Sequence, residues 1–135
     1  MMQILKMLRS FRHAFAGLRF LMEENNARFH VLAAIIVLTA GFYLKLSAIE
    51  WTIIITQIGL VLAVETLNTA IEKLCDYVSP EYHQLIGKVK DLAAAAVLIM
   101  SIVAVIVGII IFLPKIFGVN NLFTHSIIQK SFIVS

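Results

Sequence analysis

Apolar residues along the chain follow one amphipathic stretch and then three continuous blocks. In the first 22 residues, apolar side chains recur at spacings of three and four with basic residues between them, at Ile4, Leu8, Phe11, Phe15, Leu18 and Met22. This period is that of an α-helix with one apolar face. We therefore predict an amphipathic helix over about residues 4–26 that lies in the membrane interface.

The three apolar blocks cover residues 29–44, 52–64 and 92–113. The last has 22 residues without a charge, which is enough to cross a hydrocarbon core of about 30 Å. The first extends past Lys45 if that side chain snorkels, and the second reaches spanning length only if the helix continues through Glu65. The pattern predicts an all-α integral membrane helical bundle with transmembrane helices over about 29–46, 52–77 and 91–113.

We expect one domain over residues 1–118 and a C-terminal tail, residues 119–135, to which no role is assigned. Pro114 and Gly118 are expected to end the last span. Asp91 is expected at the start of that span, where an acid suits the positive end of the helix dipole. The single cysteine, Cys75, excludes an intrachain disulfide and a cysteine metal cluster.

Composition supports a membrane protein, and the distribution of charge indicates how the spans are oriented across the membrane. Apolar residues make up 61% of the 135 residues, against about 45–50% in soluble domains. Most Lys and Arg residues lie before the first span and between the second and third, which by the positive-inside rule faces both segments to the cytoplasm. The net charge of +3 fits this topology and anionic lipid, and no basic and aromatic interleaving indicates nucleic acid as a partner.

Four polar residues interrupt the second span on one side of the predicted helix: Glu65, Asn68, Glu72 and Asp76. They fall within roughly an 80° arc and about 16 Å of helix axis. Because a charge at membrane depth costs about 2.5–3.5 kcal/mol, such a stripe usually marks a functional site. From spacing alone, three interpretations stay open: chemistry, a cation path in a small oligomeric channel or transporter subunit, and hydrogen bonds that join helices.

The residue types permit phosphoryl transfer. Carboxylates and an amide oxygen are ligands suited to Mg²⁺, and the lysines at 88 and 90 follow across a short loop. Such a reaction needs positioning, charge neutralisation and a base near the acceptor hydroxyl. The chain has no P-loop and no H-R-D or D-F-G motif, so a soluble kinase is excluded.

The stripe and its surroundings resemble the prokaryotic diacylglycerol kinase family of small membrane kinases. The resemblance covers roughly residues 5–116 and rests on the block Glu65-Thr-Leu-Asn68-Thr-Ala-Ile-Glu72 with a later Lys90-Asp91. Upstream, Glu24-Asn-Asn-Ala-Arg-Phe-His is similar to an element of the undecaprenol kinase branch, and Glu81-Tyr82-His83 is similar to the diacylglycerol branch. Ala93 and Ala94 stand where some members carry a small polar residue.

The resemblance implies a homotrimer in the cell inner (cytoplasmic) membrane, with active sites between subunits at the cytoplasmic interface. It implies ATP- and Mg²⁺-dependent phosphorylation of a membrane lipid hydroxyl, with undecaprenol slightly favoured over diacylglycerol, for lipid recycling or phospholipid metabolism.

It also implies a role for each matching residue. Glu65 would be the general base, and Glu24 and Glu72 would hold magnesium. The residues that would contact ATP are Asn68, Glu81, Tyr82, His83, Lys90 and Asp91.

Other residues keep two interpretations. The family uses a basic residue of the N-terminal helix near ATP, and Lys6, Arg9 and Arg12 all compete for that role. Arg28 follows Glu24 by four residues, so an ordinary helix-surface ion pair is the alternative to any role in the site. Asp76 is either part of the site or a solvated helix end.

Overall fold

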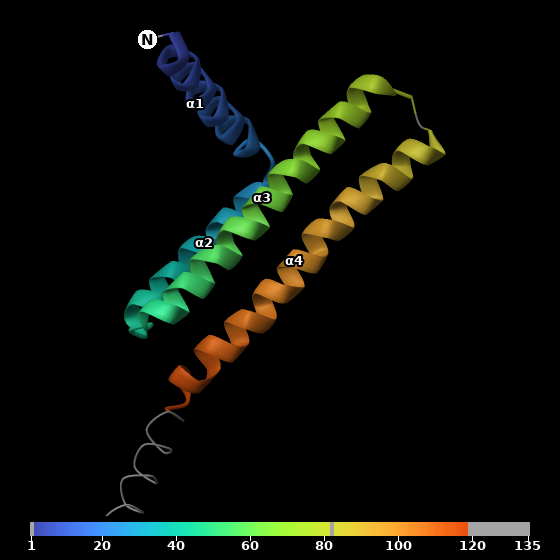
Figure 1. Cartoon of the computed structure of the whole chain (residues 1–135). Coiled ribbons are helices and arrows are strands. Elements are labelled where there is room, and N and C mark those ends of the chain that lie inside the picture. The colour runs from blue at the N-terminus through green and yellow to red at the C-terminus, as the bar shows by residue number, and fades with distance from the viewer. Residues whose placement is uncertain (1, 82, 119–135) are drawn as a thin grey trace, which may run out of the picture.

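The structure, a computed structural model, describes residues 2–81 and 83–118, and these form four helices (Figure 1). In chain order they are α1 (Met2–Leu21), α2 (Asn25–Tyr43), α3 (Ala48–Val78) and α4 (Gln84–Ile116). The last three are long and apolar enough to cross a membrane. No strand occurs in the described ranges. The predicted all-α architecture with three spans is confirmed.

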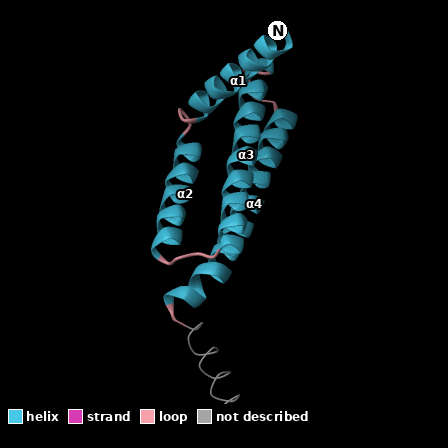
Figure 2. Ribbon diagram, turned by 60° about the vertical axis from the view of Figure 1, so that its left-hand side comes forward, coloured by secondary structure: helices cyan, strands magenta, loops and turns pink. Residues whose placement is uncertain are grey.

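Helices α3 and α4 form an antiparallel hairpin, and α2 runs beside α3 (Figures 1 and 2). Helix α1 leaves the bundle at the start of α2, toward the end at which α3 stops and α4 starts, and it points away from both of those helices (Figure 1). This places the amphipathic helix at one end of the spanning helices, as an interfacial helix requires.

The helix lengths locate that end relative to a membrane. Helix α2 has 19 residues, or about 28 Å at 1.5 Å per residue, close to the hydrocarbon thickness of about 30 Å. Helices α3 and α4 have 31 and 33 residues, or about 46 and 50 Å. The short connection from Tyr43 to Ala48 and the Lys115–Glu50 pair bring the end of α2, the start of α3 and the last turns of α4 together. Most of the excess length of α3 and α4 therefore lies beyond the start of α2. The last turns of α3 and the first turns of α4 therefore extend out of the span that α2 defines.

Several helix boundaries differ from the sequence prediction. The interfacial helix ends at Leu21, and a short turn separates it from α2. Helix α4 begins at Gln84 rather than at Asp91, so the expected placement of Asp91 at the helix start is wrong; no acid lies in that first turn. The side chain of His83 caps α4 instead, with Nδ1 accepting from the backbone N–H of Leu85 at 3.3 Å.

At its other end α4 passes through Pro114 and stops at Ile116, so Pro114 does not end the helix as expected. A proline near the end of a helix removes one hydrogen bond without breaking the element where few turns follow. Gly118 comes directly after the C-cap with a φ of 65°. This left-handed conformation is the one that glycine adopts freely after a helix.

The end of the bundle opposite α1 is closed by packing and by complementary polar groups. The backbone N–H of Ser47 donates to Glu50 Oε2 at 2.6 Å, and the N–H of Glu50 donates to Ser47 Oγ at 3.4 Å, which forms a capping box. Glu50 also pairs with Lys115 of α4 at 3.1 Å. We call these three residues, with the apolar cluster described next, the closed end.

Apolar packing surrounds that ion pair. Leu46, Ile54 and Ile111 form the buried cluster. The ring of Trp51 lies against Gly41 of α2, where an added Cβ would come within 2.9 Å of Trp51 Cη2. Glycine at this position therefore allows α2 and α3 to approach closely.

Candidate active site

Two polar residues are buried in the described part of the chain, and both belong to the predicted stripe. Glu65 is 2% exposed and Asn68 is 4% exposed, one turn apart on α3. Glu72 follows Glu65 by seven residues, two turns along the same side of α3. Burial of a carboxylate within a spanning helix is costly, which marks the position as functional rather than as packing.

Asn68 links Glu65 to the next carboxylate along the stripe. Its Nδ2 donates to Glu72 Oε1 at 3.2 Å. Its Oδ1 is buried with no hydrogen-bond partner. Since nearly all buried polar atoms are satisfied in folded proteins, this oxygen is an acceptor that a ligand can complete.

Glu24 occupies the connection between α1 and α2. It stands at the N-cap position of α2, but its side chain caps no backbone N–H. Glu24 Oε1 instead pairs with Lys73 Nζ of α3 at 2.7 Å. The alternative of a Glu24–Arg28 surface pair is wrong, because Arg28 Nε donates to the Met22 carbonyl at 2.7 Å and so closes the turn.

Asp76 is the partner of Lys90. The carboxylate Oδ1 lies 2.9 Å from Lys90 Nζ and joins α3 to α4 across 14 residues of chain. Asp76 is therefore not merely a solvated helix end. Asp91, the next residue along, is exposed on α4. We call Glu24, Glu65, Asn68, Glu72, Lys73, Asp76 and Lys90 together the open end.

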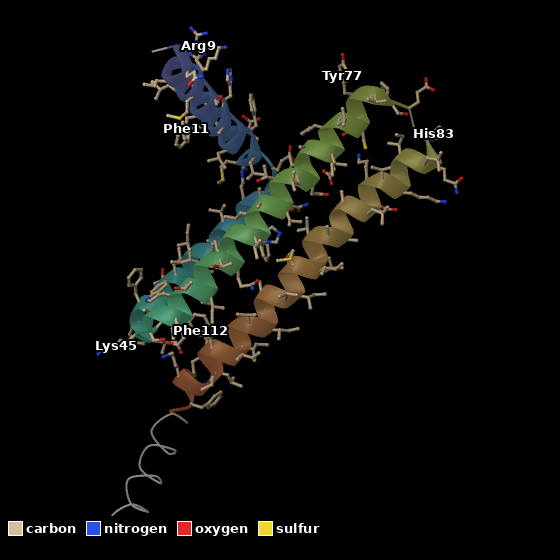
Figure 3. All side chains as sticks on the ribbon, viewed as in Figure 1. Arg9, Phe11, Lys45, Tyr77, His83 and Phe112 are labelled. Atoms are coloured by element: carbon tan, nitrogen blue, oxygen red, sulfur yellow. The ribbon has the colours of Figure 1, made fainter. Side chains whose placement is uncertain are left out.

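Other predicted contacts lie apart from this group in a single chain. Figure 3 shows Arg9 toward the free end of α1 and His83 at the start of α4, on separate arms of the molecule. Arg12 and Glu81 are exposed on those same arms. Tyr82 lies outside the described residues. One chain therefore does not bring the basic residues of α1 to the turn between α3 and α4.

The donor set fits Mg²⁺ bound with a nucleotide. No group of three or more His, Cys, Asp or Glu side chains is arranged to hold a metal within residues 2–81 and 83–118. Magnesium is usually held by only one or two carboxylates together with substrate phosphates and water. The carboxylate of Glu72 beside the unpartnered Asn68 Oδ1 supplies such a partial shell.

An apolar cavity of about 320 Å³ lies between α2, α3 and α4. Along α3 its lining runs from Ile54 to Leu62, which precedes Glu65 by about one turn. On α2 it includes His30, near the start of that helix. The cavity therefore leads from Ile54 of the closed end toward the buried carboxylate.

Lys73 is the residue of the open end that the sequence did not reveal. By its position in the sequence, Lys73 is only one more basic residue near the cytoplasmic end of the second span. Its contact with Glu24 joins residues 49 positions apart, and no spacing rule connects such a pair. The only local signal is its place directly after Glu72.

The fold and the open end define a class: an integral membrane protein with carboxylate, amide and lysine groups gathered at one end of its spans. The family model described as prokaryotic diacylglycerol kinase matches residues 12–112. The chain belongs to this family, which makes it a lipid kinase with a phosphoryl donor of the ATP type.

Three relatives illustrate the similarity. The undecaprenol kinase of Bacillus subtilis (strain 168) is 42% identical over 111 residues, which cover 82% of this chain and 90% of the relative. A diacylglycerol kinase of Synechocystis is 41% identical over 110 residues, 80% of this chain and 63% of that protein. The diacylglycerol kinase of Escherichia coli (strain K12) is 36% identical over 102 residues, 75% and 84% respectively.

Proposed function

We propose that this protein transfers the γ-phosphoryl group of ATP, bound with Mg²⁺, to the hydroxyl of a membrane lipid at the cytoplasmic interface. The observation that carries the proposal is the burial of Glu65, 2% exposed, at the end of a span and beside the Asn68–Glu72 pair. A buried carboxylate next to a free acceptor and a second carboxylate supplies a base and a partial metal shell in one turn of helix.

Each side chain has a defined task. Glu65 accepts the proton of the lipid hydroxyl as the hydroxyl oxygen attacks the γ-phosphorus, the bond from that phosphorus to the β–γ bridging oxygen breaks, and ADP leaves. Glu72 and Glu24 would hold the metal, with Glu24 approaching from the connection between α1 and α2. Asn68 orients the Glu72 carboxylate through Nδ2 and offers Oδ1 to the bound metal and nucleotide. When bound, Mg²⁺ neutralises charge on the phosphates. Lys90, held by Asp76, lies where it can balance the phosphate charge that remains.

The apolar cavity fits the hydrocarbon part of the acceptor. The stretch of its lining from Ile54 to Leu62 is about 12 Å of α3. A lipid chain seated there would present its hydroxyl near Glu65, at the edge of the span. Water is the competing acceptor, and an apolar approach to the base disfavours it.

The site is proposed to be completed by other copies in a homotrimer. One chain keeps Arg9 of α1 and His83 of α4 apart (Figure 3), so a second copy is the way to bring a basic residue of α1 to nucleotide held near Glu81, Tyr82, His83 and Asp91. The large apolar side chains exposed along the spans suit both lipid and neighbouring subunits. The charge pattern supports a cytoplasmic N-terminus and site in the inner membrane.

Undecaprenol is the favoured acceptor, with diacylglycerol as the alternative. The Bacillus relative that carries the undecaprenol name is 42% identical, and the Synechocystis and Escherichia coli relatives that carry the diacylglycerol name are 41% and 36% identical. Because 42% and 41% do not separate the two substrates, the choice rests on the element from Glu24 to His30. The product would enter lipid recycling, or phospholipid metabolism if diacylglycerol is the substrate.

The test is a direct comparison of acceptors. Purified full-length protein in mixed micelles is given ATP, Mg²⁺ and either undecaprenol or a diacylglycerol at equal concentration, and the lipid products are identified by mass spectrometry. We expect a lipid phosphate monoester in both cases and the faster rate with undecaprenol. Absence of phosphorylated lipid, together with cation flux through liposomes that hold the protein, would replace the kinase by a channel.

A further inference from the structure

Lys73 makes the contact that fixes the connection between α1 and α2 to the spanning helices. Lys73 Nζ lies 2.7 Å from Glu24 Oε1. Of the three salt bridges among the described residues, this is the one that includes the connection. Lys73 has no task of its own in the proposed phosphoryl transfer.

The direction of Lys73 on α3 explains why it reaches Glu24. At 100° per residue it lies about 80° around the helix from Glu65, whereas Glu72 lies within about 20° of Glu65. Lys73 therefore stands on the flank of the stripe. A second cavity, of about 390 Å³, lies on this flank and is lined by Glu24, Thr66, Thr69 and Lys73.

Glu24 has few other restraints. It sits on a connection of three residues, and its side chain makes no cap with α2. The nearby Arg28 is engaged with the Met22 carbonyl. The ion pair occupies Oε1 of Glu24, and the carboxylate has a second oxygen with which to bind a cation.

We propose that Lys73 is a positioning residue. Its ion pair with Glu24 Oε1 holds the Glu24 carboxylate toward the metal site at Glu72, so that Oε2 of Glu24 can join the metal ligands. This inference rests on the proposed function. Partners that hydrogen-bond a ligating carboxylate fix its orientation, and their loss typically costs about 10- to 100-fold in metal affinity. A lysine that merely competed with the cation would have the opposite effect when removed.

The experiment measures metal binding apart from turnover. The full-length protein in mixed micelles is titrated with Mn²⁺ in the presence of a non-hydrolysable ATP analogue, and bound Mn²⁺ is measured by electron paramagnetic resonance. The variants are Lys73→Met and Lys73→Gln, with Lys73→Arg as the conservative change. Lys45→Met is the matched control, since Lys45 is an exposed lysine at the closed end without a salt bridge in the described ranges.

We expect the neutral variants to bind Mn²⁺ about 10- to 100-fold more weakly, and Lys73→Arg and the control to stay close to the unaltered protein. The phosphorylation rate of Lys73→Met should recover at high Mg²⁺, because the defect lies in metal affinity. Mn²⁺ binding that is unchanged or tighter in both neutral variants overturns the role of Lys73 while lipid phosphorylation by the unaltered protein stands. An unaltered protein that neither binds Mn²⁺ nor phosphorylates lipid overturns both proposals.

Discussion

Each end of the α3–α4 hairpin carries an ion pair that joins the two helices, but the two pairs differ in solvent exposure and in the polar groups beside them. At the closed end the side chains of Lys115 and Glu50 are 16% and 25% exposed, and the capping box with Ser47 completes the polar groups. At the open end the Lys90 and Asp76 side chains are 37% and 63% exposed. At the closed end the polar groups are paired with one another and stabilise the bundle. At the open end polar groups remain exposed or without a partner, and we expect a ligand to bind there.

The buried groups sharpen this contrast. The closed end buries Leu46, Ile54 and Ile111, which need no partner. The open end buries a carboxylate, Glu65, and Asn68 Oδ1 is one of three buried polar atoms without a hydrogen bond in the described ranges, with Gln57 Oε1 and Ser101 Oγ of the cavity lining. Because an unpaired polar atom costs folding free energy, the one beside Glu72 and the buried Glu65 supports a binding role. The same pair of helices is thus a scaffold at one end and a reaction site at the other.

The largest expected effect is that of metal removal. Chelation of divalent ions with EDTA should reduce lipid phosphorylation by more than about 10³-fold, since phosphoryl transfer relies on a cation to neutralise phosphate charge. The melting temperature should stay unchanged, because the closed end contains no proposed metal ligand. Radioactive transfer from labelled ATP to lipid measures the first quantity, and a thermal scan of the same samples the second. Full activity in excess EDTA would remove magnesium from the account.

Replacement of Asn68 by Leu comes next in size. It removes the amide that donates to Glu72 Oε1 and the free acceptor beside it, so metal affinity should fall about 10- to 100-fold. The midpoint of a Mg²⁺ titration of the phosphorylation rate measures this. Thr56→Leu, an exposed change on the same helix, serves as the control. An unchanged midpoint would place the metal away from Asn68.

Lys115→Met should have the smallest effect on the phosphorylation rate. It should also lower the melting temperature most clearly. This change leaves Glu50 without its cross-helix partner, and loss of a hydrogen bond to a charged group costs about 1–3 kcal/mol. We expect a lower melting temperature and an unchanged rate per folded molecule. Lys45→Met, an exposed lysine at the same end, should alter neither. A lost rate at unchanged melting temperature would mean that the closed end takes part in the chemistry.

Sequence alone predicted the part of this architecture that depends on local pattern. Hydrophobic length identified the three spans, and helical periodicity brought Glu65 and Asn68 to one face, where both are buried. The start of α4 at Gln84 was not predicted because the polar residues before Asp91 hid a continuing helix. Helices that project beyond the membrane need no apolar pattern.

Contacts between distant residues were beyond local pattern. The Lys73–Glu24 and Lys90–Asp76 pairs join different helices, and only the packing of those helices reveals them. The roles of Glu65 as base and of Glu24 and Glu72 as metal ligands stay predictions, as do the nucleotide contacts proposed for Arg9, Arg12, Glu81 and Asp91. A single chain does not bring these last residues together.

Two glutamates of α3 test the central contrast most directly. Glu65→Gln and Glu50→Gln are measured side by side for the rate of lipid phosphorylation and for melting temperature. We predict that Glu65→Gln loses about 10²- to 10⁴-fold in rate, as loss of a general base does, without a lower melting temperature, whereas Glu50→Gln melts earlier and keeps its rate per folded molecule. Phosphate transfer by Glu65→Gln as fast as by the unaltered protein would contradict the account.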